Sequence, residues 1–477
     1  MLKKNILYNF IYQLLIMILP FITSPYLSRV VGAEGIGIYS YSYSIASYFL
    51  YIAALGLSNY GNRTIAGVRD DKEKRSRVFS EIYIMQLITG LISIVMYLIY
   101  IGFISQDKVS AVFQLALVVS SVFDINWFFF GMEDFKLTVI RNTCIKTLTV
   151  VAIFIFVKSP DDVYKYILIM AVGTLVSQII LWPFIKRYVK FKIPQVKDVV
   201  KHFKPNIILF IPVIAVSIYK IMDKIMLGQI SGMENVGYYE NAERLINMPI
   251  SLITAIGIVM LPKISGYIAK GKEEDSKKYF DLFMLIIIIF SNGAVFGLIG
   301  VSDEFVTIFY GDGFELTSTL LKYLSITIIF LAIGNVLRTQ YLIPKKKDDI
   351  YIKSAIIGAV SNLIVNIILI PKLNAVGAAI GTIFAELVVC AYQFTSSKND
   401  IKIIKYIRLE LIFGIVGYIM FVVIRLIHNP RNSIIILGGK IIVGLLIYSI
   451  ISYFIISKNI CGTKKILANN TTTVYEI

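Results

Sequence analysis

The chain is a succession of long apolar runs separated by short connections that carry most of the charged residues. A helix needs roughly 20 apolar residues to cross the hydrocarbon core of a bilayer, so runs of this length predict about fourteen transmembrane helices in an all-α integral membrane protein. The run over 139–158 is the weakest, because Lys146 interrupts it. The predicted spans cover residues 6–31, 36–60, 79–104, 110–131, 139–158, 163–185, 205–229, 237–260, 279–301, 317–342, 350–371, 374–395, 408–428 and 434–457.

The composition supports this prediction. Hydrophobic residues make up 57% of the 477 positions and charged residues 16%, whereas soluble domains are about 25% charged. The first apolar run is too long for the core of a signal peptide, so we expect a spanning helix there. With three cysteines and two histidines, we expect neither a disulfide framework nor a histidine metal site, and no cofactor.

Basic residues gather in every second connection. Six lie between Arg63 and Arg77 and seven between Lys186 and Lys204, while the connections on the opposite side carry only Lys108, Lys158, Lys372 and Arg431. By the positive-inside rule this pattern predicts that both termini are cytoplasmic. The net charge of +17 is therefore expected to set topology and contact anionic lipids rather than nucleic acid.

An internal repeat appears when the chain is shifted by 200 residues. Ile36-Gly37-Ile38-Tyr39 then falls on Val236-Gly237-Tyr238-Tyr239, and Lys72-Glu73 falls on Lys272-Glu273. Chance similarity between apolar helices is the alternative, but the match extends without a gap through the charged loop. A parallel repeat of six helices is common in transporters, whose substrate site lies between the halves. The predicted domains are residues 1–204 (helices 1–6 and a cytoplasmic linker), 205–397 (helices 7–12) and 398–477 (helices 13–14 and a tail).

Several cations fall inside the predicted spans, where a charge costs roughly 2.5–3.5 kcal/mol and usually faces water or a partner. The seventh and eighth spans each carry a cluster of charged and polar residues. Within each cluster the spacing of i, i+3 and i+4 places the side chains on one face of the helix. One interpretation is a structural ion-pair network in which Glu240 pairs with Arg244. The other is a wet cavity with surplus positive charge, which favours an anionic, phosphate-bearing cargo. The candidate cavity cations are Arg29, Lys220, Lys224 and Arg244, and the supporting residues are Asp223, Glu240, Glu243 and Asn247.

Three segments resemble a known family. Ser24-Pro25-Tyr26-Leu27-Ser28-Arg29-Val30-Val31-Gly32 resembles the opening signature of Wzx-type polysaccharide flippases, in the multidrug/oligosaccharidyl-lipid/polysaccharide exporter superfamily. Asp223-Lys224-Ile225-Met226-Leu227-Gly228 and Gly237-Tyr238-Tyr239-Glu240-Asn241-Ala242-Glu243 resemble that family too. The resemblance covers the whole chain.

The resemblance implies a MATE-like fold of two pseudo-symmetric six-helix lobes plus two C-terminal helices. It implies that the chain flips undecaprenyl-diphosphate-linked oligosaccharide to the outer leaflet of the bacterial cytoplasmic membrane by alternating access. The transported oligosaccharide would be used to build capsule, O-antigen or exopolysaccharide, and polysaccharide polymerase machinery would be a partner of the chain. The cations that would contact the diphosphate are Arg29, Lys220, Lys224 and Arg244.

Three other functions compete with this interpretation. A MATE-type drug/cation antiporter would need acids in its cavity, and the first predicted helix has none. A lipid II flippase differs mainly in its substrate. A membrane enzyme such as a glycan polymerase would need a large outer loop for its catalytic residues, and none is predicted. We therefore expect a transporter rather than an enzyme, with its driving force (membrane potential, Na⁺ or H⁺) left open.

Overall fold

The computed structural model describes residues 18–428 and 433–458, and in this part of the chain every regular element is a helix. The predicted all-α fold is thus confirmed. Ten of the described helices are long and apolar enough to cross a membrane, among them the doubtful span, which forms α7. The total of fourteen spans stays a prediction.

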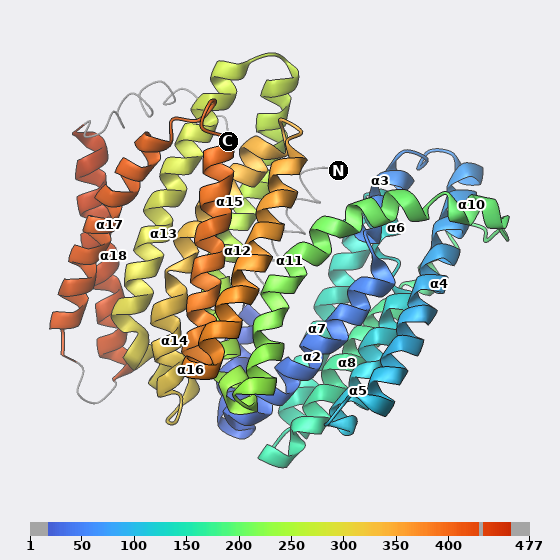
Figure 1. Cartoon of the computed structure of the whole chain (residues 1–477), viewed down its shortest axis with the longest axis horizontal. Coiled ribbons are helices and arrows are strands. Elements are labelled where there is room, and N and C mark those ends of the chain that lie inside the picture. The colour runs from blue at the N-terminus through green and yellow to red at the C-terminus, as the bar shows by residue number, and fades with distance from the viewer. Residues whose placement is uncertain (1–17, 429–432, 459–477) are drawn as a thin grey trace. The chain divides into compact units, whose positions relative to one another are not determined.

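The chain divides into two compact units, Met1–Glu240 and Asn241–Ile477, and the domain boundaries predicted after residues 204 and 397 stay predictions. Unit 1 (blue to green in Figure 1) begins with a helical stretch over residues 18–30. Its further helices are α2 (Gly32–Ala54), α3 (Leu57–Ala66), α4 (Lys72–Phe103), α5 (Lys108–Phe123), α6 (Asn126–Gly131), α7 (Phe135–Phe156), η1 (Pro160–Asp162), α8 (Val163–Ile179), α9 (Trp182–Ile185), α10 (Val196–Val200) and α11 (Phe203–Ile230).

Local polar residues set where helices of unit 1 begin and end. The fourth predicted span, over 110–131, is broken, because α5 ends at Phe123 and α6 begins at Asn126. The Asp124 carboxylate accepts the backbone N–H of Asn126 at 2.9 Å, which satisfies a donor that the interrupted helix leaves open. Asp71 caps α4 in the same way by accepting from the backbone N–H groups of Glu73 and Lys74.

Arg141 is a buried cation of unit 1. It lies on α7, within the span predicted over 139–158, and only 5% of it is exposed. Its guanidinium donates to the side-chain oxygen of Asn126 at 2.7 Å and to the carbonyl oxygen of Ser177 at 2.7 Å. Arg141 therefore joins α6, α7 and α8 inside unit 1, and these hydrogen bonds offset the cost of burying its charge.

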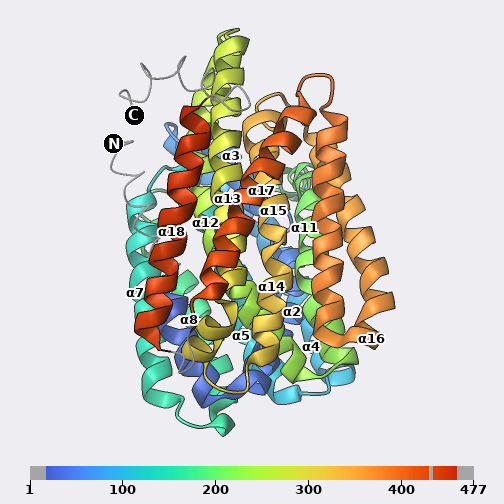
Figure 2. The same ribbon diagram turned by 90° about the vertical axis from the view of Figure 1, so that its left-hand side faces the viewer.

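Unit 2 contains the C-terminal helix pair, and α17 and α18 both pack on α13 (Figures 1 and 2). The α16 helix contains a break at Asn374, where φ is 51°, between the two spans predicted over 350–371 and 374–395. The helices are α12 (Met233–Ala269), which starts in unit 1, α13 (Glu273–Tyr310), α14 (Glu315–Ser325), α15 (Thr327–Leu337), the π-helix η2 (Arg338–Leu342), α16 (Asp348–Ser396), α17 (Ile403–Leu426) and α18 (Ile434–Ser457).

Ion pairs fasten the C-terminal pair to α13. Lys440 on α18 is 2% exposed, and its Nζ lies 2.5 Å from the carboxylate of Glu304. Arg425 on α17 lies 2.9 Å from the neighbouring Asp303. A lysine in an apolar helix is tolerated here because its carboxylate partner is buried beside it.

Glu81 on α4 is the centre of a buried polar cluster in unit 1. Its side chain is 1% exposed and lies 2.9 Å from Nζ of Lys201 and 3.0 Å from Nε2 of His202. The other ring nitrogen of His202 lies 2.5 Å from the hydroxyl of Tyr60. Because Lys201 and His202 directly precede α11, the cluster fixes where that long helix begins.

Asp281 on α13 makes the corresponding contact in unit 2. Its carboxylate lies 2.7 Å from Nζ of Lys405 and accepts a hydrogen bond from the hydroxyl of Tyr406, both in the first turns of α17. Asp281 is the repeat partner of Glu81 at the shift of 200 residues. In each unit an acid on the equivalent helix thus contacts a lysine and its aromatic neighbour at the start of a later helix, α11 in unit 1 and α17 in unit 2.

Candidate functional site

The start of α12 packs closely on α2 within unit 1. A Cβ atom added to Gly37 would lie 1.7 Å from the carbonyl oxygen of Met233, and one added to Gly237 would lie 1.8 Å from that of Ala33. Only glycine permits so short an approach between the two backbones. The contact is reciprocal. Gly37 meets Met233, and Gly237 meets Ala33, which is the repeat partner of Met233. The two contacts are thus related to each other as in a two-fold symmetric interface.

One turn further along these helices, a charged contact joins three helices. The carboxylate of Glu240 on α12 accepts a hydrogen bond of 2.7 Å from the hydroxyl of Ser40 on α2. The same carboxylate oxygen lies 2.7 Å from Nζ of Lys224 on α11. The side chains of Lys224 and Glu240 are 16% and 14% exposed. This mostly buried ion pair is the candidate functional site.

Asp223 lies next to this pair and has a different role. It is 2% exposed, and its carboxylate accepts a hydrogen bond of 2.9 Å from the hydroxyl of Tyr239. Neighbouring residues of α11 therefore bind neighbouring residues of α12: Asp223 contacts Tyr239, and Lys224 contacts Glu240. These contacts hold the Lys224 side chain in a defined position.

The other predicted cations of unit 1 lie outside this contact. Lys220 is exposed on α11, although its spacing placed it on the face of Asp223 and Lys224. Arg29 is exposed at the end of the helical stretch over 18–30, and its guanidinium donates to the carbonyl oxygen of Pro25 at 3.0 Å. The structure thus brings Lys224, Asp223 and Glu240 together and leaves Lys220 and Arg29 at the surface of the unit.

The remaining predicted residues belong to unit 2. Glu243 and Arg244 are partly buried on α12, and Asn247 is exposed. The carbonyl oxygen of Asn247 accepts a hydrogen bond of 2.7 Å from the hydroxyl of Ser251. The substrate-binding roles of all these residues stay predictions.

Sequence analysis missed Ser40 and Tyr239 as parts of the site. The repeat contained a signal for one of them, since Ser40 and Glu240 are 200 residues apart and follow Gly37 and Gly237 by one helical turn. The chemistry of the site is that of a mostly buried lysine paired with a carboxylate. No cluster of three or more metal-ligating side chains occurs among the described residues.

Comparison with known proteins agrees with this architecture. The "Putative O-antigen transporter" of Shigella dysenteriae is 24% identical over 400 residues, which cover 83% of this chain and all of that protein. The solved structure of a lipid II flippase, MurJ, in an inward closed conformation has a TM-score of 0.78 at 17% identity and covers 95% of this chain and 99% of its own. An inward-facing MATE family multidrug transporter has a TM-score of 0.58 at 16% identity, with coverage of 83% and 99%.

The structural likenesses confirm the predicted MATE-like membrane fold. The sequence model of a protein family described as "Polysaccharide biosynthesis protein" matches residues 2–268, which is more than half of the chain. This chain therefore belongs to that family of polysaccharide biosynthesis proteins.

Proposed function

We propose that this chain is a flippase that moves undecaprenyl-diphosphate-linked oligosaccharide from the cytoplasmic to the outer leaflet of a bacterial cytoplasmic membrane. The family assignment carries this proposal. The Shigella dysenteriae relative, which is named as a transporter of O-antigen and matches over its whole length, supports it. Both termini would be cytoplasmic, as the distribution of basic loops favours.

We propose that Lys224 contacts the diphosphate of the cargo. The Lys224 ammonium is mostly buried and lies 2.7 Å from the Glu240 carboxylate. A diphosphate carries more than one negative charge and can compete with Glu240 for the ammonium, most strongly where water is scarce and charges are weakly screened. Lys224 would then exchange Glu240 for the cargo when the cargo enters and return to Glu240 when it leaves.

This mechanism needs no chemical change in the cargo. Glu240 would keep Lys224 neutralised and in place between transport cycles, and Ser40 would hold the Glu240 carboxylate. Binding to Lys224 must be weak enough for release on the other side, and competition by Glu240 provides such a limit. Polysaccharide polymerase machinery, which would act on the released cargo, is the partner that we propose.

Transport by the purified chain in proteoliposomes tests the function. We expect the chain to expose labelled undecaprenyl-diphosphate-linked oligosaccharide to an added glycosidase faster than protein-free vesicles do. In a parallel sample without the glycosidase, the recovered lipid should have unchanged mass. Lipid II and a cationic dye are the competing cargoes. Faster movement of lipid II would favour a lipid II flippase, and movement of the dye alone would favour a drug/cation antiporter; either result would contradict the proposal.

A further inference from the structure

A cavity of about 420 Å³ opens at one end of unit 2, where the first turns of α13, the turn after η2 and the start of α17 meet. We call it the end cavity. Its volume lies in the range of about 300–1,000 Å³ that is usual for small-molecule sites. Four lysines and four carboxylates line it, and they come from separate segments of the chain: Lys277, Lys345, Lys402, Lys405, Glu273, Glu274, Asp281 and Asp400.

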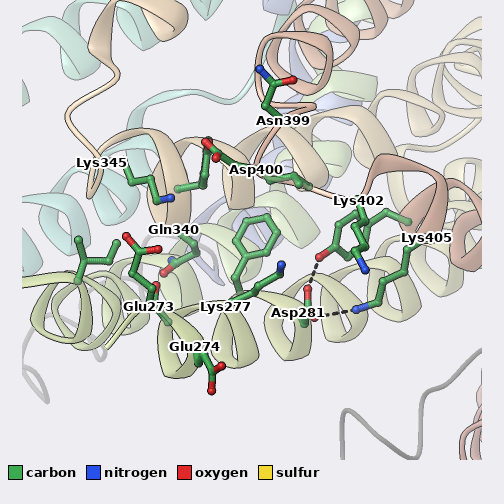
Figure 3. A pocket seen from close by; sticks show the side chains of 16 residues that line it. Glu273, Glu274, Lys277, Asp281, Gln340, Lys345, Asn399, Asp400, Lys402 and Lys405 are labelled. Carbon is green, nitrogen blue, oxygen red and sulfur yellow. Dashed lines mark hydrogen bonds and ion pairs between the residues drawn. The ribbon is translucent and has the colours of Figure 1, made fainter. Parts of the chain in front are cut away.

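Two of the four carboxylates form ion pairs at the cavity, and the other two lie at the start of α13. Asp281 is paired with Lys405, as Figure 3 shows. Asp400 lies 2.8 Å from Nζ of Lys347. Glu273 and Glu274 occupy the first turn of α13, where the helix dipole favours negative charge, and in Figure 3 the Glu274 carboxylate points away from the lysines.

Three of the lysines that line the cavity have no such ion pair. In the described ranges, no carboxylate lies within ion-pair distance of Lys277, Lys345 or Lys402. Lys402 even occupies the N-cap of α17, where the helix dipole disfavours a cation. Beside the two glutamates of α13, these three lysines therefore give the cavity an excess of positive charge, which comes from three segments that are distant in sequence.

Aromatic side chains complete the walls. Phe280, Tyr341 and Tyr406 line the cavity and are buried, and Nζ of Lys345 lies 5.1 Å from the centre of the Tyr341 ring. Lys345 is partly buried beside this ring, which strengthens its attraction to an anion, whereas Lys277 and Lys402 are exposed. Lysine ammonium groups bind phosphate oxygens as mobile point charges.

We propose that the end cavity is a binding site for a phosphate ester, separate from the Lys224 contact. Two sources share this chemistry: the head group of an anionic phospholipid, and a soluble sugar or polyol phosphate. By the predicted topology the cavity faces the cytoplasm, where both occur. The inference goes beyond the proposed transport function and does not depend on which cargo the chain moves.

Binding to the full chain in neutral detergent tests the site. The cavity variant is Lys277→Gln/Lys345→Gln/Lys402→Gln. The matched control is Lys278→Gln/Lys346→Gln/Lys398→Gln, which removes the same charge from neighbouring lysines that do not line the cavity. Phosphatidylglycerol and sn-glycerol 3-phosphate are titrated separately, phosphatidylcholine and sodium chloride serve as control ligands, and thermal unfolding reports binding.

We expect at least one of the two phosphate probes to raise the unfolding temperature of the wild type and the control variant, with an apparent affinity at least tenfold weaker in the cavity variant. A response to phosphatidylglycerol alone identifies a lipid head group, and a response to glycerol phosphate identifies a soluble ester. Glutamine removes the charge but keeps a polar side chain, and the unfolding temperature without ligand reports whether each variant folds.

Two results would overturn the proposal. One is an equal affinity of the cavity and control variants for the phosphate probes. The other is a wild-type unfolding temperature that rises no more with the phosphate probes than with phosphatidylcholine or sodium chloride.

Discussion

Gly37 and Gly237, which occupy equivalent positions in the two copies of the repeat, pack backbone to backbone within unit 1. Each would force a new Cβ atom to less than 2 Å from a carbonyl oxygen of the opposing helix. Ser40 and Glu240 repeat this pairing one turn later and bring the Lys224 ion pair with them. The close helix contact and the charged site are therefore parts of one arrangement.

The glycine contact predicts a position-specific cost for alanine. Gly237→Ala should lower the free energy of unfolding by about 2–3 kcal/mol, because the helices must separate to admit the methyl group. Gly266→Ala on the same helix is the control, since no atom lies within 4 Å of its added Cβ, and it should be neutral or stabilising by up to about 1 kcal/mol. Unfolding in detergent measures both, and equal effects would contradict the close contact.

Burial predicts a difference between two ion-paired glutamates on α4. Glu81→Gln should cost about 2–3 kcal/mol, because it weakens the hydrogen bonds of a carboxylate that is 1% exposed and leaves Lys201 and His202 without its charge. Glu73→Gln should cost far less than Glu81→Gln, because Glu73 is 82% exposed in its pair with Lys192, and exposed pairs contribute little. The difference between the two unfolding free energies checks this, and a cost for Glu73→Gln as large as that for Glu81→Gln would show that burial is not decisive.

The ion pair between Asp400 and Lys347 should depend on pH. Hydrogen bonds from Lys347 and Tyr341 lower the pKa of Asp400 to about 2. Its contribution to stability is therefore complete well above the ordinary carboxyl pKa of about 3.9 and is lost as the pH falls through that value toward the folded-state pKa. The pKa of Lys347 is raised, mainly by its hydrogen bond to Asp400, so its contribution is present below the ordinary lysine pKa and is lost at strongly alkaline pH.

The measurement compares the unfolding temperatures of the wild type and Asp400→Asn across pH. Their difference should be small, since 41% of the Asp400 side chain is exposed and surface pairs contribute less than about 1 kcal/mol. It should stay constant from about pH 5 to about pH 9 and shrink below about pH 4. A difference that grows on acidification would contradict the assigned hydrogen bonds.

Hydrophobic runs predicted the helices well, because crossing a bilayer requires a length of apolar chain that is visible in the sequence. The break at Asp124 escaped prediction, since an aspartate within an apolar run does not reveal that its side chain will cap a new helix. The partners of Arg141 escaped prediction for a related reason: a basic residue near the end of an apolar run does not reveal which other helices its guanidinium will contact.

The candidate site was predictable in part. The spacing on the seventh and eighth spans identified Lys224, Asp223 and Glu240 as charges within the membrane. It could not show that Glu240 pairs with Lys224, because their contact joins different helices and spacing within one helix reveals only partners on that helix. The repeat held further information, since it relates Ser40 to Glu240, but only the structure shows that repeat partners contact each other.

The contact between Lys224 and Glu240 allows the central claim to be tested directly, because a cargo-binding lysine and a purely structural ion pair predict different outcomes. Initial transport rates of undecaprenyl-diphosphate-linked oligosaccharide are compared in proteoliposomes for Lys224→Gln, Glu240→Gln and the exposed control Lys165→Gln, with amounts of folded protein matched. We predict that Lys224→Gln lowers the rate at low cargo concentration at least about tenfold, which corresponds to about 1.4 kcal/mol of lost binding. Glu240→Gln, which removes the competing carboxylate, should tighten cargo binding and so should not lower that rate, and Lys165→Gln should stay near the wild-type rate. Equal losses in Lys224→Gln and Glu240→Gln, or wild-type transport by Lys224→Gln, would contradict a role for this lysine in holding the diphosphate.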